Sequence, residues 1–121
     1  MALTGSCLCG AVTFTAEEVP EAMGACHCGM CRRWAGGPLF AVEAAAVRFE
    51  GEDRIGRYRS SDWAERGFCT TCGTNLFYRI VENDHYVMCL GAFDDQERWR
   101  FDGQVFIDDK PAYYDFANQT R

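Results

Sequence analysis

The sequence predicts an all-β fold of short antiparallel strands with little helix, and three observations support this prediction. Apolar and polar residues alternate over several segments of about five residues, as in strands with one buried face. Helical periodicity is weak, and its best candidate is Gly29–Ala35, one or two turns that Gly36-Gly37-Pro38 would end. The chain has 121 residues, 48% of them hydrophobic, and no linker or repeat divides it. We therefore expect residues 1–121 to form a single domain.

The alternating segments place the strands along the chain. We expect strands at Ala11–Thr15, Ala46–Glu50, Gly56–Ser60, Leu76–Ile80, His85–Leu90 and Gln104–Ile107. A segment that ends at Phe68 forms a β-hairpin with the strand after it, and the tip of this hairpin is Cys69–Gly73. Turns are expected at Gly51–Asp53 and Glu82–Asp84. Ala41–Ala46 contains helix-forming alanines, but it is too short to stand alone as a helix.

The composition argues against several classes of partner. Twelve Lys and Arg residues against eighteen Asp and Glu give a net charge of −6, and the pI is near 4.8. Nucleic-acid binding through phosphate neutralisation is therefore not expected. No apolar run is long enough to span a bilayer, and Met1–Gly10 lacks the basic and apolar regions of a secretory signal. These features predict a cytoplasmic protein without a membrane partner, in a reducing compartment.

Seven of the eight cysteines fall into close clusters, which in a reducing compartment are more typical of metal ligands than of disulfides. Two clusters are pairs, Cys7/Cys9 and Cys69/Cys72. The second pair has the C-x-x-C-G spacing of a zinc knuckle, in which Gly73 is free to adopt a positive φ. If the N-terminal strand lies beside the hairpin, the two pairs meet and supply four sulfur ligands to a structural zinc ion.

The third cluster, Cys26, Cys28 and Cys31, offers three ligands to a second zinc ion. Because a tetrahedral ion takes four ligands, three cysteines leave one position for water or substrate, as in catalytic zinc sites. An incoming thiolate is the ligand that such a soft site favours. His27 or Cys89 would instead close the cluster into a second structural site. We favour the open site, because His27 should point away from its neighbours on an extended C-x-C segment, and Cys89 lies in an alternating apolar strand.

Three motifs together resemble one known family. They are Cys7-Leu8-Cys9-Gly10, Cys26-His27-Cys28-Gly29-Met30-Cys31-Arg32-Arg33 and Arg66-Gly67-Phe68-Cys69-Thr70-Thr71-Cys72-Gly73-Thr74-Asn75-Leu76. In order and spacing they are similar to the glutathione-dependent formaldehyde-activating enzymes, a family that includes the domain of centromere protein V, and the resemblance covers essentially the whole chain. It implies a β-tent fold, with a structural zinc ion on the two cysteine pairs and a catalytic one on the third cluster. It also implies a carbon–sulfur lyase that condenses formaldehyde with glutathione to S-hydroxymethylglutathione.

Residues that follow the third cluster, and one turn further along, are candidates for substrate binding. Eleven of the twelve basic residues are Arg, which binds carboxylates through paired hydrogen bonds, and glutathione carries two carboxylates. The candidates are Arg32, Arg33, Trp34, Gly36, Gly37, Ser60 and Ser61. Alternatively, the arginines serve solubility or pair with acids, the glycines end a helical turn, and the serines form a turn.

These observations leave three hypotheses for function. In the first, the protein is a zinc enzyme that acts on glutathione or a similar thiol and on a small aldehyde, and the zinc ion deprotonates the bound thiol. In the second, it is a non-catalytic two-zinc scaffold for a protein partner. Seven thiolates against the four charges of two zinc ions would take the net charge from −6 to −9, which argues against a chromatin partner. The third is a redox Cys28-x-x-Cys31 pair, but the chain lacks the βαβ pattern of such oxidoreductases.

Overall fold

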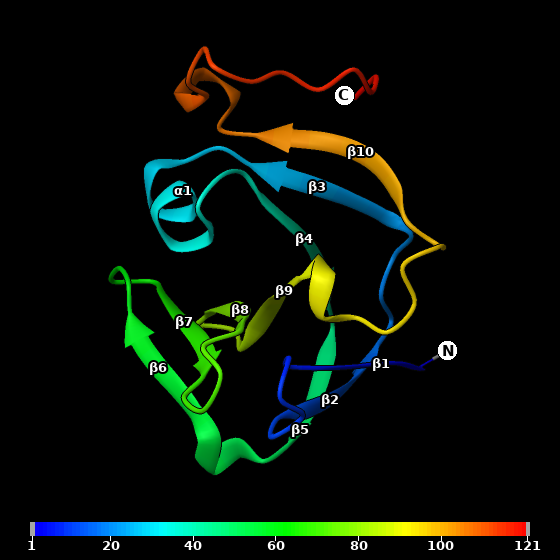
Figure 1. Ribbon diagram of the computed structural model, residues 1–121, viewed down its shortest axis with the longest axis vertical. Coiled ribbons are helices and arrows are strands. Elements are labelled where there is room, and N and C mark those ends of the chain that lie inside the picture. The colour runs from blue at the N-terminus through cyan, green and yellow to red at the C-terminus, as the bar shows by residue number, and fades with distance from the viewer. Residues whose placement is uncertain (1, 121) are drawn as a thin grey trace.

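The computed structural model describes residues 2–120 and shows a mainly β architecture of two sheets with one short helix (Figure 1). The predicted all-β fold class is therefore confirmed. The strands in this part of the chain are β1 (Ala2–Ser6), β2 (Thr13–Glu17), β3 (Ala22–Cys26), β4 (Leu39–Ala44), β5 (Ala46–Glu50), β6 (Ile55–Arg59), β7 (Ala64–Cys69), β8 (Asn75–Ile80), β9 (His85–Cys89) and β10 (Arg100–Val105). The helix is α1 (Gly29–Ala35), and the 3₁₀ turns are η1 (Glu52–Arg54), η2 (Leu90–Ala92) and η3 (Ile107–Asp109).

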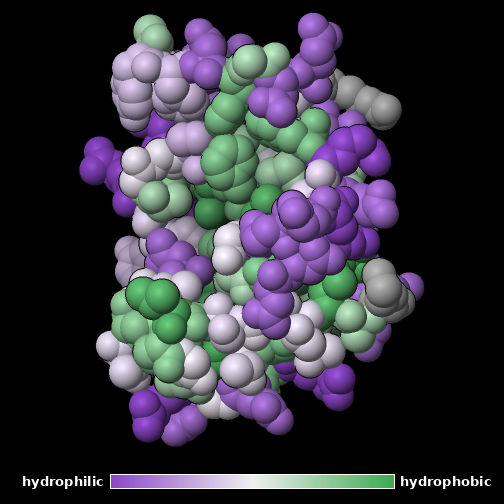
Figure 2. All heavy atoms as spheres, turned by 45° about the vertical axis from the view of Figure 1, so that its right-hand side comes forward, coloured by the Kyte–Doolittle hydropathy of each residue, from purple (hydrophilic) through white to green (hydrophobic). Residues whose placement is uncertain are grey.

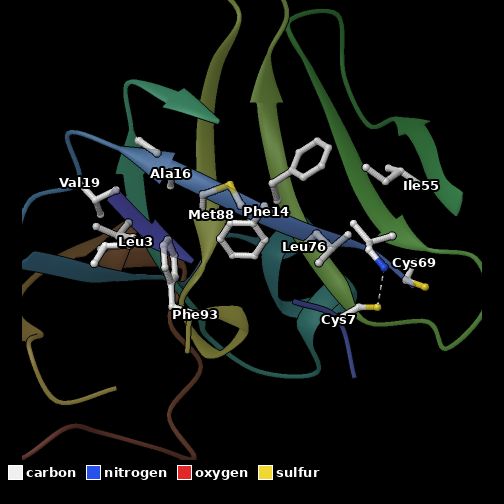
Figure 3. Packing of buried hydrophobic residues seen from close by; sticks show 14 of the residues in the cluster. Leu3, Cys7, Phe14, Ala16, Val19, Ile55, Cys69, Leu76, Met88 and Phe93 are labelled. Atoms are coloured by element: carbon white, nitrogen blue, oxygen red, sulfur yellow. Dashed lines mark hydrogen bonds between the residues drawn. The ribbon is translucent and has the colours of Figure 1, made fainter. Parts of the chain in front are cut away.

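The smaller sheet is antiparallel and has the order β1-β2-β5. Buried residues alternate with more exposed ones along β1 and β2, and the half-buried Val47 and Phe49 do so along β5, so one face of the sheet supplies the main hydrophobic core. Figure 3 shows Leu3, Phe14 and Ala16 from this sheet lying together with Met88 and Phe93. The Phe14 and Phe93 rings meet edge to face with centroids 5.2 Å apart.

The larger sheet has seven strands in the order β10-β3-β4-β9-β8-β7-β6. Its neighbours are antiparallel as predicted, with one exception: β10 runs parallel to β3, pairing Arg100 with Ala22 and Val105 with Cys26. The chain reaches β10 from β9 by a long connection through η2, which returns it to the start of β3 (Figure 1). A connection of this kind is required because parallel strands cannot be joined by a tight turn.

The two faces of the larger sheet have different neighbours. Successive side chains on a strand point to opposite faces, and cross-strand partners share a face. Val42, Met88 and Phe77 are register partners and are fully or nearly fully buried in the main core, against the smaller sheet. The next residues along these strands, such as Val87 and Tyr78, therefore point to the opposite face. That second face carries Cys26 and is the one on which the site described below is built.

Several elements differ from the sequence predictions. The segment Ala41–Ala46 contains the end of strand β4 and the first residue of β5 rather than remaining without regular structure, because pairing with β3 and β9 outweighs the helical propensity of alanine in β4. Strand β2 begins two residues later than expected, and β10 begins four residues earlier. Strands β1 and β3 were not expected. The predicted helix and the strand β5 have the bounds expected from the sequence.

The turn before β6 requires a glycine at position 51, because a side chain there would not fit. Gly51 has φ +81, and an added Cβ would overlap the carbonyl oxygen of Ala11. Gly36 has nearly the same φ, +82, but open space where its Cβ would be. We expect Gly36→Ala to cost about 1 kcal/mol through the left-handed backbone alone. Gly51→Ala should cost about 1–3 kcal/mol more because a backbone atom must move. Denaturant unfolding of the two variants measures this difference, and equal losses would contradict it.

The segment after β10 crosses the upper end of the larger sheet (Figure 1), and its Phe116 ring packs against rings of that sheet. Phe116 meets Phe101 and Phe40, with ring centroids 5.0 and 5.6 Å away. Apolar residues gather in the upper half of the face seen in Figure 2, where Figure 1 places β10 and the C-terminal segment. Within residues 2–120, no helix has the length and apolar character needed to cross a membrane.

Candidate metal centres

The first centre brings the two cysteine pairs together as predicted, although by a different contact. The Sγ atoms of Cys7, Cys9, Cys69 and Cys72 all lie within 4.8 Å of one another. The first strand expected from the sequence corresponds to β2, which pairs with β1 and β5 and not with the hairpin, so it is the loop between β1 and β2 that reaches the β7–β8 turn. The backbone N–H of Leu8 in this loop donates to the hydroxyl of Thr74 at 3.0 Å.

The sulfur spacing of this four-cysteine centre fits a zinc ion. The Sγ of Cys9 is 3.7 Å from that of Cys7 and 3.9 Å from that of Cys69. A tetrahedral ion with Zn–S bonds of about 2.3 Å separates its sulfurs by about 3.8 Å. The chain also stabilises a thiolate at one of these cysteines: the hydrogen bond from the Thr74 hydroxyl is the largest cause that lowers the pKa of Cys72 to about 5. The Val12 N–H donates to the Cys7 Sγ at 3.3 Å, drawn as a dashed line in Figure 3.

The second centre lies where β3 turns into α1. Cys26 is the last residue of β3, Cys28 is the N-cap of α1, and Cys31 lies in the first turn of the helix. Their Sγ atoms are within 4.8 Å of one another. The N–H of Cys31 donates to the Cys28 Sγ at 3.4 Å, so a sulfur performs the capping role that a Ser or Asp oxygen usually performs. The short C-x-C-x-x-C spacing thus converges because a strand ends and a helix begins within it.

Neither of the two candidates for a fourth ligand joins this three-cysteine centre within residues 2–120. His27 is fully buried and points away from the sulfurs, as the extended C-x-C segment predicts. Its Nδ1 lies 2.6 Å from the Tyr114 hydroxyl and its Nε2 lies 2.8 Å from the Gln104 Oε1. Cys89 packs beside the centre in a small apolar cluster, and burial raises its pKa to about 12. Within the described residues, the centre therefore offers a metal ion three cysteine sulfurs and no fourth side chain.

Arg66 is a residue of this centre to which sequence reasoning gave no role. Its side chain is buried, at 6% exposure, and its Nη1 and Nη2 are each 3.7 Å from the Cys31 Sγ. The guanidinium also lies over the Trp34 ring at 5.0 Å and the Tyr78 ring at 5.3 Å. One sequence signal pointed to it: Arg66 alternates with Ala64 and Phe68 in its strand, so a charged residue takes a position in an apolar row.

Cys26 and Cys31 influence the ionisation of each other's thiol. A hydrogen bond between Cys26 and Cys31 is the largest cause that lowers the pKa of Cys31 and raises that of Cys26. Burial opposes ionisation of Cys31, and the Arg66 guanidinium favours it. Of the two sulfurs, Cys31 is therefore the one whose thiolate its surroundings favour.

A cleft of about 290 Å³ opens beside Cys26 on the same face of the larger sheet. Its lining is mostly small or apolar, and it includes Gly24, Ala41 and Gly103 together with the ring of Tyr78. An added Cβ at Gly103 would meet nothing within 4 Å, so the space above this glycine is open. The cleft gives small molecules a route to Cys26.

The other candidate substrate residues lie in different places. Trp34 contacts the Arg66 guanidinium and so borders the three-cysteine centre. The Arg32 Nε donates to the carbonyl of His27 at 2.9 Å, whereas Arg33 is exposed. Gly36 takes the left-handed conformation that ends α1, which is the structural alternative for the glycines, and Gly37 follows it.

Ser60 and Ser61 form the turn between β6 and β7. Both backbone N–H groups donate to the carbonyl of Ala64, at 3.2 and 3.3 Å. The turn lies at the end of β7 opposite to Cys69. This placement matches the turn interpretation of the two serines, and the structure does not bring them to the cleft.

Comparison with known proteins identifies relatives of this chain. The family described as glutathione-dependent formaldehyde-activating enzyme matches residues 2–109. A protein of Schizosaccharomyces pombe that is named as an uncharacterized lyase is 39% identical over 118 residues, which are 96% of this chain and 86% of the relative. A crystal structure of a Rhodobacter sphaeroides protein shares the fold, with a TM-score of 0.66 at 24% identity over 76% of this chain and 88% of that one. The extent of the family match shows that the chain belongs to the glutathione-dependent formaldehyde-activating enzyme family.

Proposed function

We propose that the protein is a carbon–sulfur lyase that joins a thiol, glutathione or a close relative, to formaldehyde or another small aldehyde. In this reaction the thiol sulfur bonds to the carbonyl carbon, the C=O π bond breaks, and the thiol proton ends on the oxygen. The observation that carries the proposal is the convergence of Cys26, Cys28 and Cys31, to which residues 2–120 add no fourth metal-ligating side chain. We assign the reaction to this centre and a structural role to the four-cysteine centre.

Zinc is the ion that we propose for both centres. Thiolate ligands in groups of three and four favour zinc among the common divalent ions, and the sulfur spacing of the four-cysteine centre fits its tetrahedral geometry. When bound to three cysteines, the ion supplies a position at which an incoming thiol is held as its thiolate. Residues 1–121 would then act as one domain, in a compartment where the cysteines stay reduced.

The side chains around the three-cysteine centre supply the surroundings that the reaction needs. Trp34 and Tyr78 pack against the cluster that contains Cys26 and Cys31, and their rings lie beside the Arg66 guanidinium, so they make the surroundings of the centre less polar. The cleft beside Cys26 admits the aldehyde next to the place where the thiol sulfur is held. Arg33, which is exposed on α1 two residues after Cys31, is available to pair with a glutathione carboxylate.

Zinc X-ray absorption during a glutathione titration tests the proposal. We expect the average first shell of the two-zinc protein to gain sulfur when glutathione is added. We also expect formation of S-hydroxymethylglutathione, followed by NMR, to exceed the rate in buffer. If the zinc first shell does not change and the adduct forms no faster than in buffer, the enzyme hypothesis is contradicted and the non-catalytic scaffold is favoured. One zinc ion or none per chain under reducing conditions would favour the redox hypothesis.

A further inference from the structure

Arg66 is a buried cation whose partner is a sulfur of the three-cysteine centre. Both of its terminal nitrogens donate to Cys31, and its Nε is buried without a hydrogen-bond partner. Glu65, the adjacent acid, pairs instead with Arg57 and Arg79, at 2.6 and 3.1 Å. Burying a guanidinium is costly unless its charge is compensated. The charge of Arg66 is therefore placed where the cysteines supply the negative charge.

The guanidinium is held so that it cannot turn away from the centre. The rings of Trp34 and Tyr78 both lie near it, and its own strand is paired on both sides, with Tyr58 and Tyr78 as the register partners of Arg66. Arginine remains charged at all physiological pH values. The centre thus has a fixed positive charge in a desolvated position.

The charge of the metal-loaded centre shows what this arginine can do. A divalent ion with three thiolates carries a charge of −1, and a fourth thiolate would make it −2. Without compensation, that second negative charge would have to be buried beside Cys31, which is 2% exposed. With Arg66 included, the charge is zero before the thiolate binds and −1 afterwards. A neutral ligand such as imidazole gains nothing comparable from the guanidinium.

We infer that Arg66 is a specificity-determining residue that makes the open position of the three-cysteine centre prefer an anionic thiolate over a neutral ligand. This inference rests on the proposed function, because it concerns the position at which the thiol binds. The thiol RSH binds as RS⁻ and releases its proton to solvent, and solvent returns a proton to the carbonyl oxygen when the adduct forms. The four-cysteine centre offers a contrast within the same chain: Cys9 is exposed there, so water solvates the charge and no buried guanidinium is needed.

The test uses the cobalt-loaded protein, whose d–d bands change when any ligand binds and whose sulfur-to-cobalt charge-transfer bands grow only when a thiolate binds. We would titrate it with 2-mercaptoethanol, which has no carboxylate, and separately with imidazole. For Arg66→Met we expect the thiol affinity to fall about tenfold or more while the imidazole affinity stays within about twofold. Arg66→Lys should restore most of the thiol preference. Arg57→Met removes the same charge one strand away and should leave the ratio of the two affinities unchanged.

The outcomes separate this inference from the proposed function. If the unmodified protein binds cobalt at both centres but no thiol, the proposed function fails. If it binds thiol and Arg66→Met keeps the same ratio of affinities, the inference about Arg66 is overturned. Should Arg66→Met no longer load the three-cysteine centre, Arg66→Gln, which keeps an N–H donor, takes its place. If the Met, Gln and Lys variants all fail to bind cobalt at the three-cysteine centre, metal binding requires the shape of the arginine and not its charge. That result would also overturn the inference.

Discussion

Cys69→Ser is expected to abolish the cooperative folding of the chain. Cys69 is fully buried, ends β7 and belongs to the four-cysteine centre, which ties the loop after β1 to the β7–β8 hairpin. Structural zinc ions contribute about 10–16 kcal/mol to the folding of small domains, whereas a whole domain is stable by about 5–15 kcal/mol. The loss of one ligand therefore removes a contribution as large as the total stability.

Circular dichroism during thermal unfolding, with zinc content per chain, measures this effect. We expect Cys69→Ser to show no cooperative transition and to retain less than one zinc ion per chain. Chelation of the unmodified protein should reproduce the unfolded spectrum. A Cys69→Ser variant with two zinc ions and an unchanged melting temperature would show that the four-cysteine centre is not structural.

Cys31→Ser is expected to remove the activity and spare the fold. Cys31 is the sulfur that accepts both hydrogen bonds from Arg66, and it lies in a separate small cluster outside the main core. Its replacement leaves two sulfurs at the centre, too few for the proposed thiol-binding site. We expect one zinc ion per chain, a cooperative unfolding transition, and adduct formation at the rate found in buffer.

Cys89→Ala is the matched control for this second experiment. Cys89 is also buried, in the same small cluster as Cys31, but it lies outside the group of converging sulfurs. We expect it to keep two zinc ions and to lose about 1 kcal/mol of stability. If Cys31→Ser retains adduct formation above the buffer rate, or if Cys89→Ala loses it, the assignment of the reaction to the three-cysteine centre is wrong.

The parts of the site that could be predicted from sequence are those whose chemistry is local. Cys69 and Cys72 lie at the tip of a hairpin with Gly73 at φ +82, as the C-x-x-C-G spacing predicts. The convergence of Cys26, Cys28 and Cys31 also follows from spacing, because a strand end and a helix start are enough to bring them together. Such motifs carry their geometry within a few residues, so no knowledge of the rest of the fold was needed.

The parts that escaped prediction depend on partners distant in sequence. Strand β3 contains Ala, Met and Gly, which have little intrinsic preference for strands, and it forms because β4 and β10 pair with its two sides. Arg66 lies 35 residues from Cys31 in sequence, and only the register of β7 against β8 places it beneath the helix that carries Cys31. Tertiary pairing therefore determines both the strand and the contact.

Strand β7 carries a residue of each centre, because Arg66 and Cys69 lie three positions apart on it. A metal ion bound at the four-cysteine centre would immobilise this strand. The Arg66 guanidinium would then be in position before the three-cysteine centre binds its own ion. The two centres would then bind metal in order, the four-cysteine centre first. When zinc is scarce, part of the protein would be folded and inactive, with an ion in the four-cysteine centre alone. The enzymatic activity would then fall more steeply with the zinc supply than the amount of folded protein does.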